Sequence, residues 1–157
     1  MEGVEDILSS YFGDIDIVGL REAHDASKPG PMADILIGAK KQDLLNVFYD
    51  RMHTHKEVSE RMYHLSGSVI LHVNSADYSA WEWRWKCFVH MSDSDERDFV
   101  YYEKEMMRSV ATANPKNYQL WNHRRKLAMF QGPSCLKEEC TFTAACLEFD
   151  AKNYHAW

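Results

Sequence analysis

Three near copies of one eight-residue phrase constrain the fold of this chain more than any other feature. Each copy carries a tyrosine and ends on a tryptophan three residues later; the copies are NSADYSAW at 74–81, NPKNYQLW at 114–121 and DAKNYHAW at 150–157. The tyrosines lie 40 residues apart between the first two copies and 36 apart between the last two. A period of this length accommodates two helices and two turns, so it predicts an all-α superhelix of helical-hairpin repeats.

The fourth residue of each copy is suited to begin a helix. Asp77, Asn117 and Asn153 have short polar side chains that can accept a hydrogen bond from an otherwise unpaired N–H of the first helical turn. Pro115 lacks an N–H and has a fixed φ, which suits the turn before the second of these helices. The phrase therefore predicts a capping turn followed by a helix.

Beyond the second cap, Tyr118, Trp121 and Arg125 share one helical face. We expect this stripe to pack against the preceding hairpin, with the guanidinium paired or stacked. The three tryptophans of the copies are interpreted as core residues, so that any function belongs to the capping turns.

Apolar residues at spacings of three and four predict four further helices. The stripes are Leu44–Phe48–Met52, Val58–Met62–Leu65–Val69, Phe99–Tyr102–Met106–Val110 and Leu136–Cys140–Ala144–Leu147. Breaks are expected near 29–31, 92–95 and 131–134, and no stretch alternates with the period of a strand. Gly67 falls inside the second of these helices, where it costs about 1 kcal/mol relative to alanine.

These patterns predict two regions. Residues 1–30 have weak periodicity and are expected to form an extended or partly ordered arm, whereas residues 31–157 form the hairpin repeats. The third copy stops at Trp157, where the first turn of its helix would begin. Since solenoids end in polar capping units, we expect this chain to be the N-terminal part of a longer solenoid.

Composition narrows the function classes. The formal net charge of −6 argues against nucleic acid as a partner, and no apolar run approaches the roughly 20 residues of a membrane-spanning helix. The acidic start does not resemble a signal peptide, and the four cysteines show no C-x-x-C spacing, so reduced thiols in the cytoplasm are expected, most of them packed in the core. The pair His53 and His55 lacks further ligands at a metal-binding spacing, so no metal site is expected on this chain.

The strings NPKNYQLWNHRR and DAKNYHAW resemble the N-Y-x-x-W-x-x-R-R repeat of the alpha subunit shared by protein farnesyltransferase and protein geranylgeranyltransferase type I. The resemblance covers about residues 31–157. The first copy departs from it, because Asp77 replaces the asparagine and Trp85 stands where the second arginine would be.

This resemblance implies a crescent of helical pairs that wraps a beta subunit and is active only with it. In that family the beta subunit holds the catalytic zinc and most of the isoprenoid and peptide pockets, and magnesium is implied for the holoenzyme. The reaction moves a farnesyl or geranylgeranyl group from its diphosphate to the cysteine of a C-terminal CaaX sequence.

The same resemblance implies catalytic residues on this chain. Lys116, beside a helix N-terminus, matches the lysine that contacts the leaving diphosphate, and that position suits the stabilisation of negative charge. Tyr118, Tyr154 and His155 match positions near the same rim, where a phenol or an imidazole N–H can bond phosphate oxygens; each is equally compatible with a structural role.

Three further residues are implied in substrate binding. Gln119 matches a residue that bonds the terminal carboxylate of the CaaX sequence, and Ala76 and Tyr78 match residues that line the pocket for its last side chain. Two alternatives stay open from the sequence: the alpha subunit of Rab geranylgeranyltransferase, and a non-catalytic helical-repeat scaffold that binds a protein along its concave face.

Overall fold

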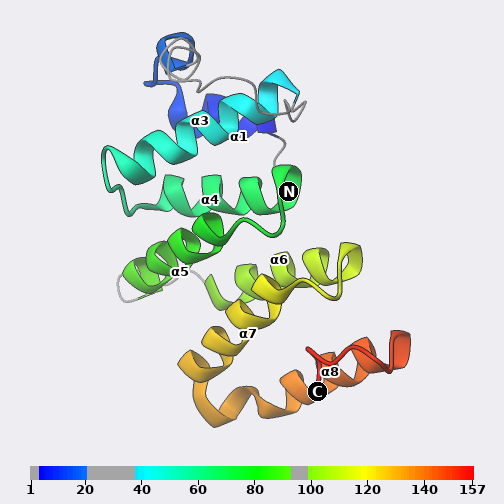
Figure 1. Cartoon of the computed structure of the whole chain (residues 1–157). Helices are drawn as coiled ribbons and strands as arrows, with labels where there is room; N and C mark the ends of the chain where they lie inside the picture. The colour runs from blue at the N-terminus through cyan, green and yellow to red at the C-terminus, as the bar shows by residue number, and fades with distance from the viewer. Residues whose placement is uncertain (1–3, 21–37, 93–98) are drawn as a thin grey trace.

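The computed structural model describes residues 4–20, 38–92 and 99–157. Within these ranges all the regular secondary structure is helical (Figure 1). In chain order the elements are α1 (Val4–Phe12), α3 (Ala39–His53), α4 (Glu60–Ser68), the π-helix η1 (Val69–Val73), α5 (Tyr78–Ser92), α6 (Phe99–Ala113), α7 (Tyr118–Gln131), the 3-10 helix η2 (Gly132–Cys135) and α8 (Leu136–Phe149).

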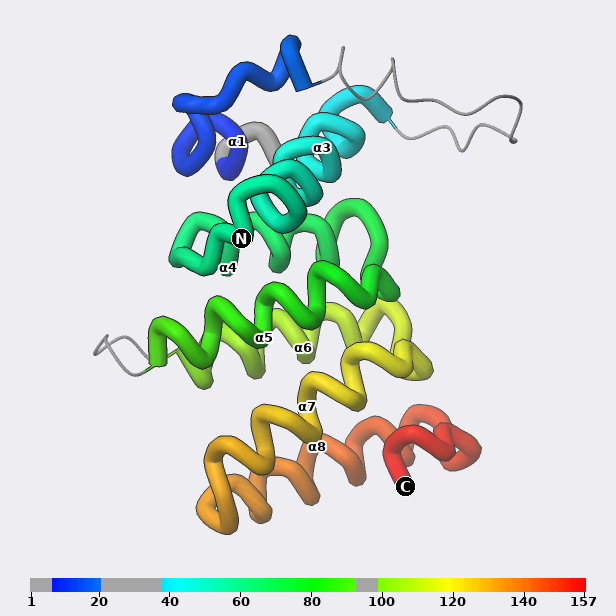
Figure 2. Tube along the Cα trace, turned by 60° about the vertical axis from the view of Figure 1, so that its left-hand side comes forward, coloured from blue at the N-terminus to red at the C-terminus, as the bar shows by residue number. Residues whose placement is uncertain are grey.

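Successive helices run back and forth across the long axis of the molecule, with α1 and α3 at one end and α8 at the other (Figure 2). Neighbours in the chain pack on one another, as α3 does on α4, α4 on α5 and α6 on α7, and α7 also contacts α5. The predicted all-α superhelix of helical-hairpin repeats is confirmed.

The predicted apolar stripes differ in how deeply they are buried. Leu44, Phe48 and Met52 of α3 are all buried in the core. In α6 the stripe is buried at three positions, but Tyr102 is 52% exposed. None of the described residues of α8 is buried, and Leu136 is 61% exposed. The helix predicted from this stripe is present as α8, but the stripe itself is not part of the core.

The N-terminal segment contains a packed helix. Ile7 and Phe12 of α1 belong to the hydrophobic core, and α1 contacts both α3 and α4. This part of the expected arm is thus helical and not extended. The expected break at 29–31 and the boundary at residue 30 lie outside the described residues. Of the expected break at 92–95, residue 92 ends α5 and residues 93–95 lie outside the described residues. The break at 131–134 is confirmed by the transition from α7 to η2.

A buried ion pair ties α5 to α6. The guanidinium of Arg84 lies 2.7 Å from Glu103 Oε1 and donates to the Tyr63 carbonyl at 2.8 Å, while His123 Nε2 lies 2.6 Å from Glu103 Oε2. Burial alone would raise the pKa of Glu103, but Arg84 and His123 outweigh it and lower that pKa to about 2. Since His123 is on α7, this carboxylate joins three helices.

Gly67 has a packing function that its helix propensity conceals. A β-carbon at this position would lie 2.5 Å from Arg84 Nη1, closer than atoms can approach. The glycine of α4 therefore makes the space in which the Arg84 guanidinium sits.

Candidate functional site at the capping turns

The three capping turns make the predicted side-chain hydrogen bonds, and the predicted helix follows the first two as α5 and α7, whereas residues 154–156 form a turn. Asn117 Oδ1 accepts from the N–H groups of Gln119 and Leu120 at 2.9 and 3.2 Å. Asp77 Oδ1 accepts from the Ala80 N–H at 2.9 Å, and Asn153 Oδ1 accepts from the His155 N–H at 3.2 Å. The caps fix the backbone that carries the predicted site residues.

Each asparagine cap also reaches the turn before it. Asn117 Nδ2 donates to the Ser75 carbonyl at 2.6 Å, and that oxygen also accepts from the indole N–H of Trp81 at 2.8 Å. The next turn repeats the arrangement, since the Pro115 carbonyl accepts from Asn153 Nδ2 at 2.8 Å and from the Trp121 indole at 2.7 Å. The turns are thus stacked at a fixed spacing through shared carbonyl oxygens.

The first copy departs from this arrangement for a local reason. The carboxylate of Asp77 accepts a hydrogen bond from the Tyr49 hydroxyl at 2.8 Å. The group that Asp77 meets is a hydroxyl donor and not a carbonyl acceptor, so a carboxylate fits here where an amide is needed in the later copies. Burial, and then the bond to Asp77, raise the pKa of Tyr49 to about 12.

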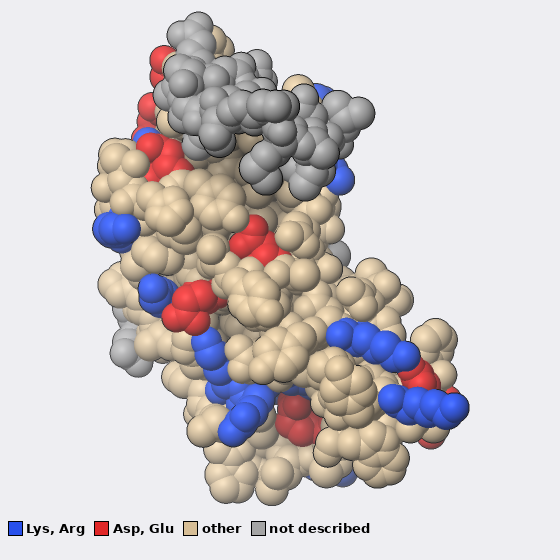
Figure 3. Space-filling view, in the orientation of Figure 1, with Lys and Arg blue, Asp and Glu red and all other residues tan. Residues whose placement is uncertain are grey.

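An ion pair links the second and third turns at the surface. Lys116 Nζ lies 2.8 Å from Asp150 Oδ2, and the lysine side chain is 58% exposed. Asp150 Oδ1 accepts from the Lys152 N–H at 3.0 Å. In Figure 3 basic and acidic side chains gather at the edge of the molecule formed by these turns. The amine that the sequence predicts to be catalytic is accessible and already beside a charged partner.

The aromatic candidates gather at the same two turns. The His155 ring packs edge-on against Tyr118, with centroids 5.9 Å apart, and lies 4.2 Å from the Tyr154 ring. Tyr118 is 61% exposed and Tyr154 is 75% exposed. Lys116 belongs to the turn that carries Tyr118, and its ion pair with Asp150 joins it to the turn that carries Tyr154 and His155. These four residues of the two linked turns are here called the rim; Lys116, Tyr118 and Tyr154 are exposed and His155 is half-buried.

Gln119 lies beside the rim but is buried. Its Nε2 has no hydrogen-bond partner among the described residues. A hollow of about 290 Å³ borders it, and its lining includes both Tyr78 and Tyr118. Ala76 is exposed in the first turn and is not among the described residues that line this hollow. The structure thus brings together Gln119 and Tyr78, and does not bring Ala76 to them.

The predicted stripe on α7 is wrong in its partners. Trp121 packs on Phe142 of α8, with ring centroids 5.8 Å apart, so it faces the following helix. Arg125 is exposed, and the buried guanidinium is that of Arg124, which donates to Glu139 at 2.7 and 2.9 Å. The side chains of α7 that reach α5 include His123 and also Lys126, which pairs with Glu82.

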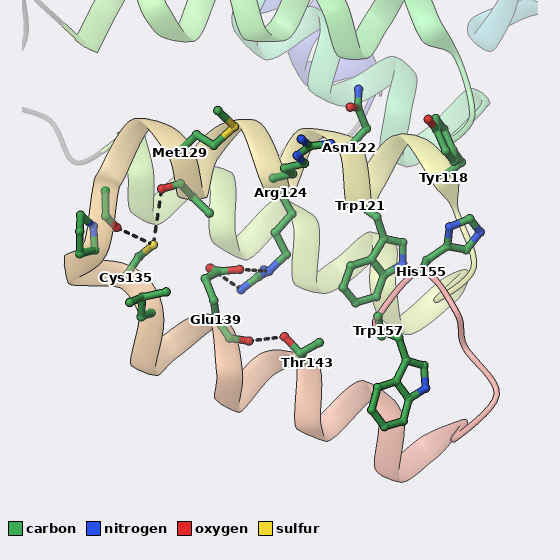
Figure 4. A pocket seen from close by; sticks show the side chains of 16 residues that line it. Tyr118, Trp121, Asn122, Arg124, Met129, Cys135, Glu139, Thr143, His155 and Trp157 are labelled. Atoms are coloured by element: carbon green, nitrogen blue, oxygen red, sulfur yellow. Dashed lines mark hydrogen bonds and ion pairs between the residues drawn. The ribbon is translucent and has the colours of Figure 1, made fainter.

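Trp157 does not lie in the core, because it is 83% exposed. It lies at one end of an open groove of about 700 Å³ between α7 and α8, which Trp121, Arg124 and Glu139 also line (Figure 4). His123 of α7 packs on Trp81 and Trp85 of α5. Of the three repeat tryptophans, Trp81 is buried, Trp121 is half-buried and Trp157 is exposed. The expectation that they are core residues is therefore confirmed for Trp81 only.

The described cysteines and histidines differ in burial and in their contacts. Cys87 and Cys135 are buried, but Cys140 is exposed, so the expectation of a core thiol is wrong there. Among residues 4–20, 38–92 and 99–157, no three side chains of His, Cys, Asp or Glu come together as metal ligands would. His53 instead stacks on Tyr49 at 5.8 Å. Within the same ranges, no helix has the length and apolar character to cross a bilayer.

Comparison with known proteins identifies the repeat. Residues 101–130 and 136–157 match the profile of the protein prenyltransferase alpha subunit repeat. The alpha subunit of protein farnesyltransferase/geranylgeranyltransferase type-1 from Schizosaccharomyces pombe is 33% identical over 72 residues. That match covers 46% of this chain and 22% of the length of the relative. The predicted resemblance is confirmed, and the residues that match the repeat profile include both turns of the rim.

Proposed function

Because this chain carries protein prenyltransferase alpha subunit repeats, we propose that it belongs to the alpha subunit of a heterodimeric protein prenyltransferase of the farnesyltransferase/geranylgeranyltransferase type I kind. The enzyme moves a farnesyl or geranylgeranyl group from its diphosphate to the cysteine of a C-terminal CaaX sequence. Activity requires a beta subunit, which provides the zinc, the isoprenoid cavity and most of the peptide site.

One observation supports this proposal: the two successive turns that carry Lys116, Tyr118, Tyr154 and His155 are joined by the Lys116–Asp150 ion pair and by the contact between the Tyr118 and His155 rings. When the cysteine sulfur bonds to C1 of the isoprenoid, the C1–O bond breaks and its electron pair goes to the diphosphate. The ammonium of Lys116 meets the charge that builds on those oxygens, and the neighbouring phenol and imidazole donate hydrogen bonds to them. Zinc, held by the beta subunit, keeps the cysteine as a thiolate, and magnesium would balance the charge of the diphosphate.

Gln119 supports the peptide part of the proposal. A buried amide N–H₂ without a partner costs free energy, and a carboxylate oxygen is a strong acceptor for it. In the proposed complex the CaaX carboxylate bonds Gln119 Nε2, and Tyr78 forms the adjacent wall for the last side chain. A cytoplasmic location is part of the proposal, and the four free cysteines suit a reducing compartment.

The test is single-turnover prenyl transfer by the full-length alpha subunit co-expressed with its beta subunit. We expect Lys116→Ala to slow transfer about 100-fold, as removal of a transition-state donor does, with little loss of isoprenoid diphosphate affinity. Lys137→Ala, which removes an exposed lysine of α8 far from the rim in sequence, is the matched control and keeps the wild-type rate.

Other results would redirect the proposal. An unchanged rate in Lys116→Ala removes the catalytic role of the lysine. Failure to transfer to a CaaX peptide without an escort protein favours the Rab-type enzyme, and the absence of any beta-subunit association favours a scaffold.

A further inference from the structure

We propose that Asp150 is a positioning residue, which holds the Lys116 ammonium at the rim before the isoprenoid diphosphate arrives. This inference rests on the proposed function of Lys116. Asp150 lies in the third turn and Lys116 in the second, so the stacking of the two turns affects catalysis.

Asp150 is built to hold a cation in one place. Its Oδ1 is fixed by the Lys152 N–H at 3.0 Å, and its backbone N–H donates to the Cys146 carbonyl at 3.0 Å. The other oxygen, Oδ2, is directed to Lys116 Nζ at 2.8 Å. The ion pair, together with the turn bond from Lys152, lowers the pKa of Asp150, so the carboxylate is charged throughout the neutral range.

The repeats show that the turn itself does not require a carboxylate. The first copy has Asn74 at the equivalent position, and Asn74 Oδ1 accepts from the Ala76 N–H at 3.0 Å, the same bond that Asp150 makes. An asparagine amide is therefore sufficient for this turn. The negative charge at 150 needs another explanation.

That explanation lies in the preceding turn. The residue that begins each copy can be compared with the third residue of the copy before it. Where the third residue is Ala76, the next copy begins with Asn114; where it is Lys116, the next copy begins with Asp150. The acid thus occurs where a lysine of the turn before can reach it, and the observed pair joins them.

A flexible lysine at an exposed surface samples many rotamers, and fixing them costs entropy at the moment of reaction. A carboxylate at 2.8 Å selects one region for the ammonium in advance, while leaving its other two N–H groups available to the diphosphate oxygens. The pair thus orients the amine without occupying all its donors.

The test is Asp150→Asn in the full-length alpha subunit with its beta partner. The variant keeps the turn, as Asn74 does in the first copy, and removes only the charge. We expect the single-turnover transfer rate to fall about two- to five-fold, in line with the modest strength of an exposed pair, while affinity for inorganic pyrophosphate does not weaken. Glu148→Gln, which removes an exposed acid two residues earlier, is the matched control and leaves both unchanged.

A double-mutant comparison separates positioning from general damage. In a Lys116→Ala background, Asp150→Asn is expected to have no further effect, because the group that it positions is gone. A wild-type rate for Asp150→Asn, a faster rate, or equal slowing in the Lys116→Ala background overturns the inference. If Lys116→Ala alone has no effect on the rate, the proposed role of Lys116 fails first, and the two failures are distinguishable.

Discussion

Glu103 offers a quantitative test of the interior that supports the rim. Its side chain is fully buried, and it meets Arg84 of α5 and His123 of α7. We expect Glu103→Gln, which keeps the shape and removes the charge, to lower the free energy of unfolding by about 3 to 5 kcal/mol, because it leaves a buried guanidinium without its counter-charge.

The pKa of Glu103 gives an independent magnitude. Its fall from an ordinary value of 4.5 to about 2 corresponds to about 3 kcal/mol of stability at pH 7, since each pKa unit is worth about 1.36 kcal/mol. The folded state has the lower pKa, so this contribution is fully present above about pH 5 and is lost as the pH falls toward 2. By pH 3 it should decline to about half.

Urea unfolding followed by tryptophan fluorescence, at pH 7 and at pH 3, measures both effects. The difference between wild type and Glu103→Gln should be largest at pH 7 and smaller at pH 3. Glu82→Gln is the matched control, because Glu82 pairs with Lys126 on the surface and is 52% exposed, so its loss should cost at most about 1 kcal/mol. Equal costs for the two variants, or a difference that does not depend on pH, would refute the reasoning.

Three further predictions concern the same elements. Gly67→Ala should destabilise the protein by about 1 to 3 kcal/mol in urea unfolding, because the new methyl group meets Arg84. From helix propensity alone the same substitution would be stabilising. An increase in stability would show that Arg84 can move. Asn117→Asp should keep the cap but lose the bond to the Ser75 carbonyl, and lower the free energy of unfolding by about 1 kcal/mol. Asn117→Ala should lose both bonds and lower it by about 2 kcal/mol in the same assay. A wild-type stability for Asn117→Asp would mean that the bond between turns contributes nothing. In steady-state transfer assays, Gln119→Leu should raise the KM for a CaaX peptide about tenfold with kcat little changed, because it removes a hydrogen bond to a charged group; an unchanged KM would exclude Gln119 from peptide binding.

The sequence was sufficient for what depends on local chemistry. The capping bonds of Asp77, Asn117 and Asn153 follow from short polar side chains at the same place in each copy, and all three bonds are present, although only Asp77 and Asn117 precede a helix in the described part of the chain. The period of the copies likewise predicts the helical hairpins, and the resemblance of the second and third copies led to the rim residues that the structure brings together.

What the sequence concealed depends on contacts between residues far apart in the chain. The donors of Asn117 and Asn153 reach carbonyls 42 and 38 residues earlier, and nothing local indicates this second bond. Glu103 appears in sequence as one more charged residue of an amphipathic helix, whereas its partners come from two other helices. Gly67 appears as a cost to its helix until Arg84 is seen beside it.

Periodicity also cannot say which apolar face acquires a partner. The stripes on α3 and α8 both begin with two steps of four residues, yet the α3 stripe is buried and α8 has no buried residue. Similarly, the sequence does not distinguish the adjacent arginines 124 and 125. Arg124 is the buried one because its guanidinium pairs with Glu139.

The most direct measurement is a structure of the full-length alpha subunit with its beta subunit and a bound isoprenoid diphosphate. The proposal predicts that Lys116 Nζ lies within hydrogen-bond distance of a diphosphate oxygen, with the Tyr118, Tyr154 and His155 side chains around the same group. A diphosphate held by the beta subunit alone, with the rim of this chain facing solvent, would contradict it.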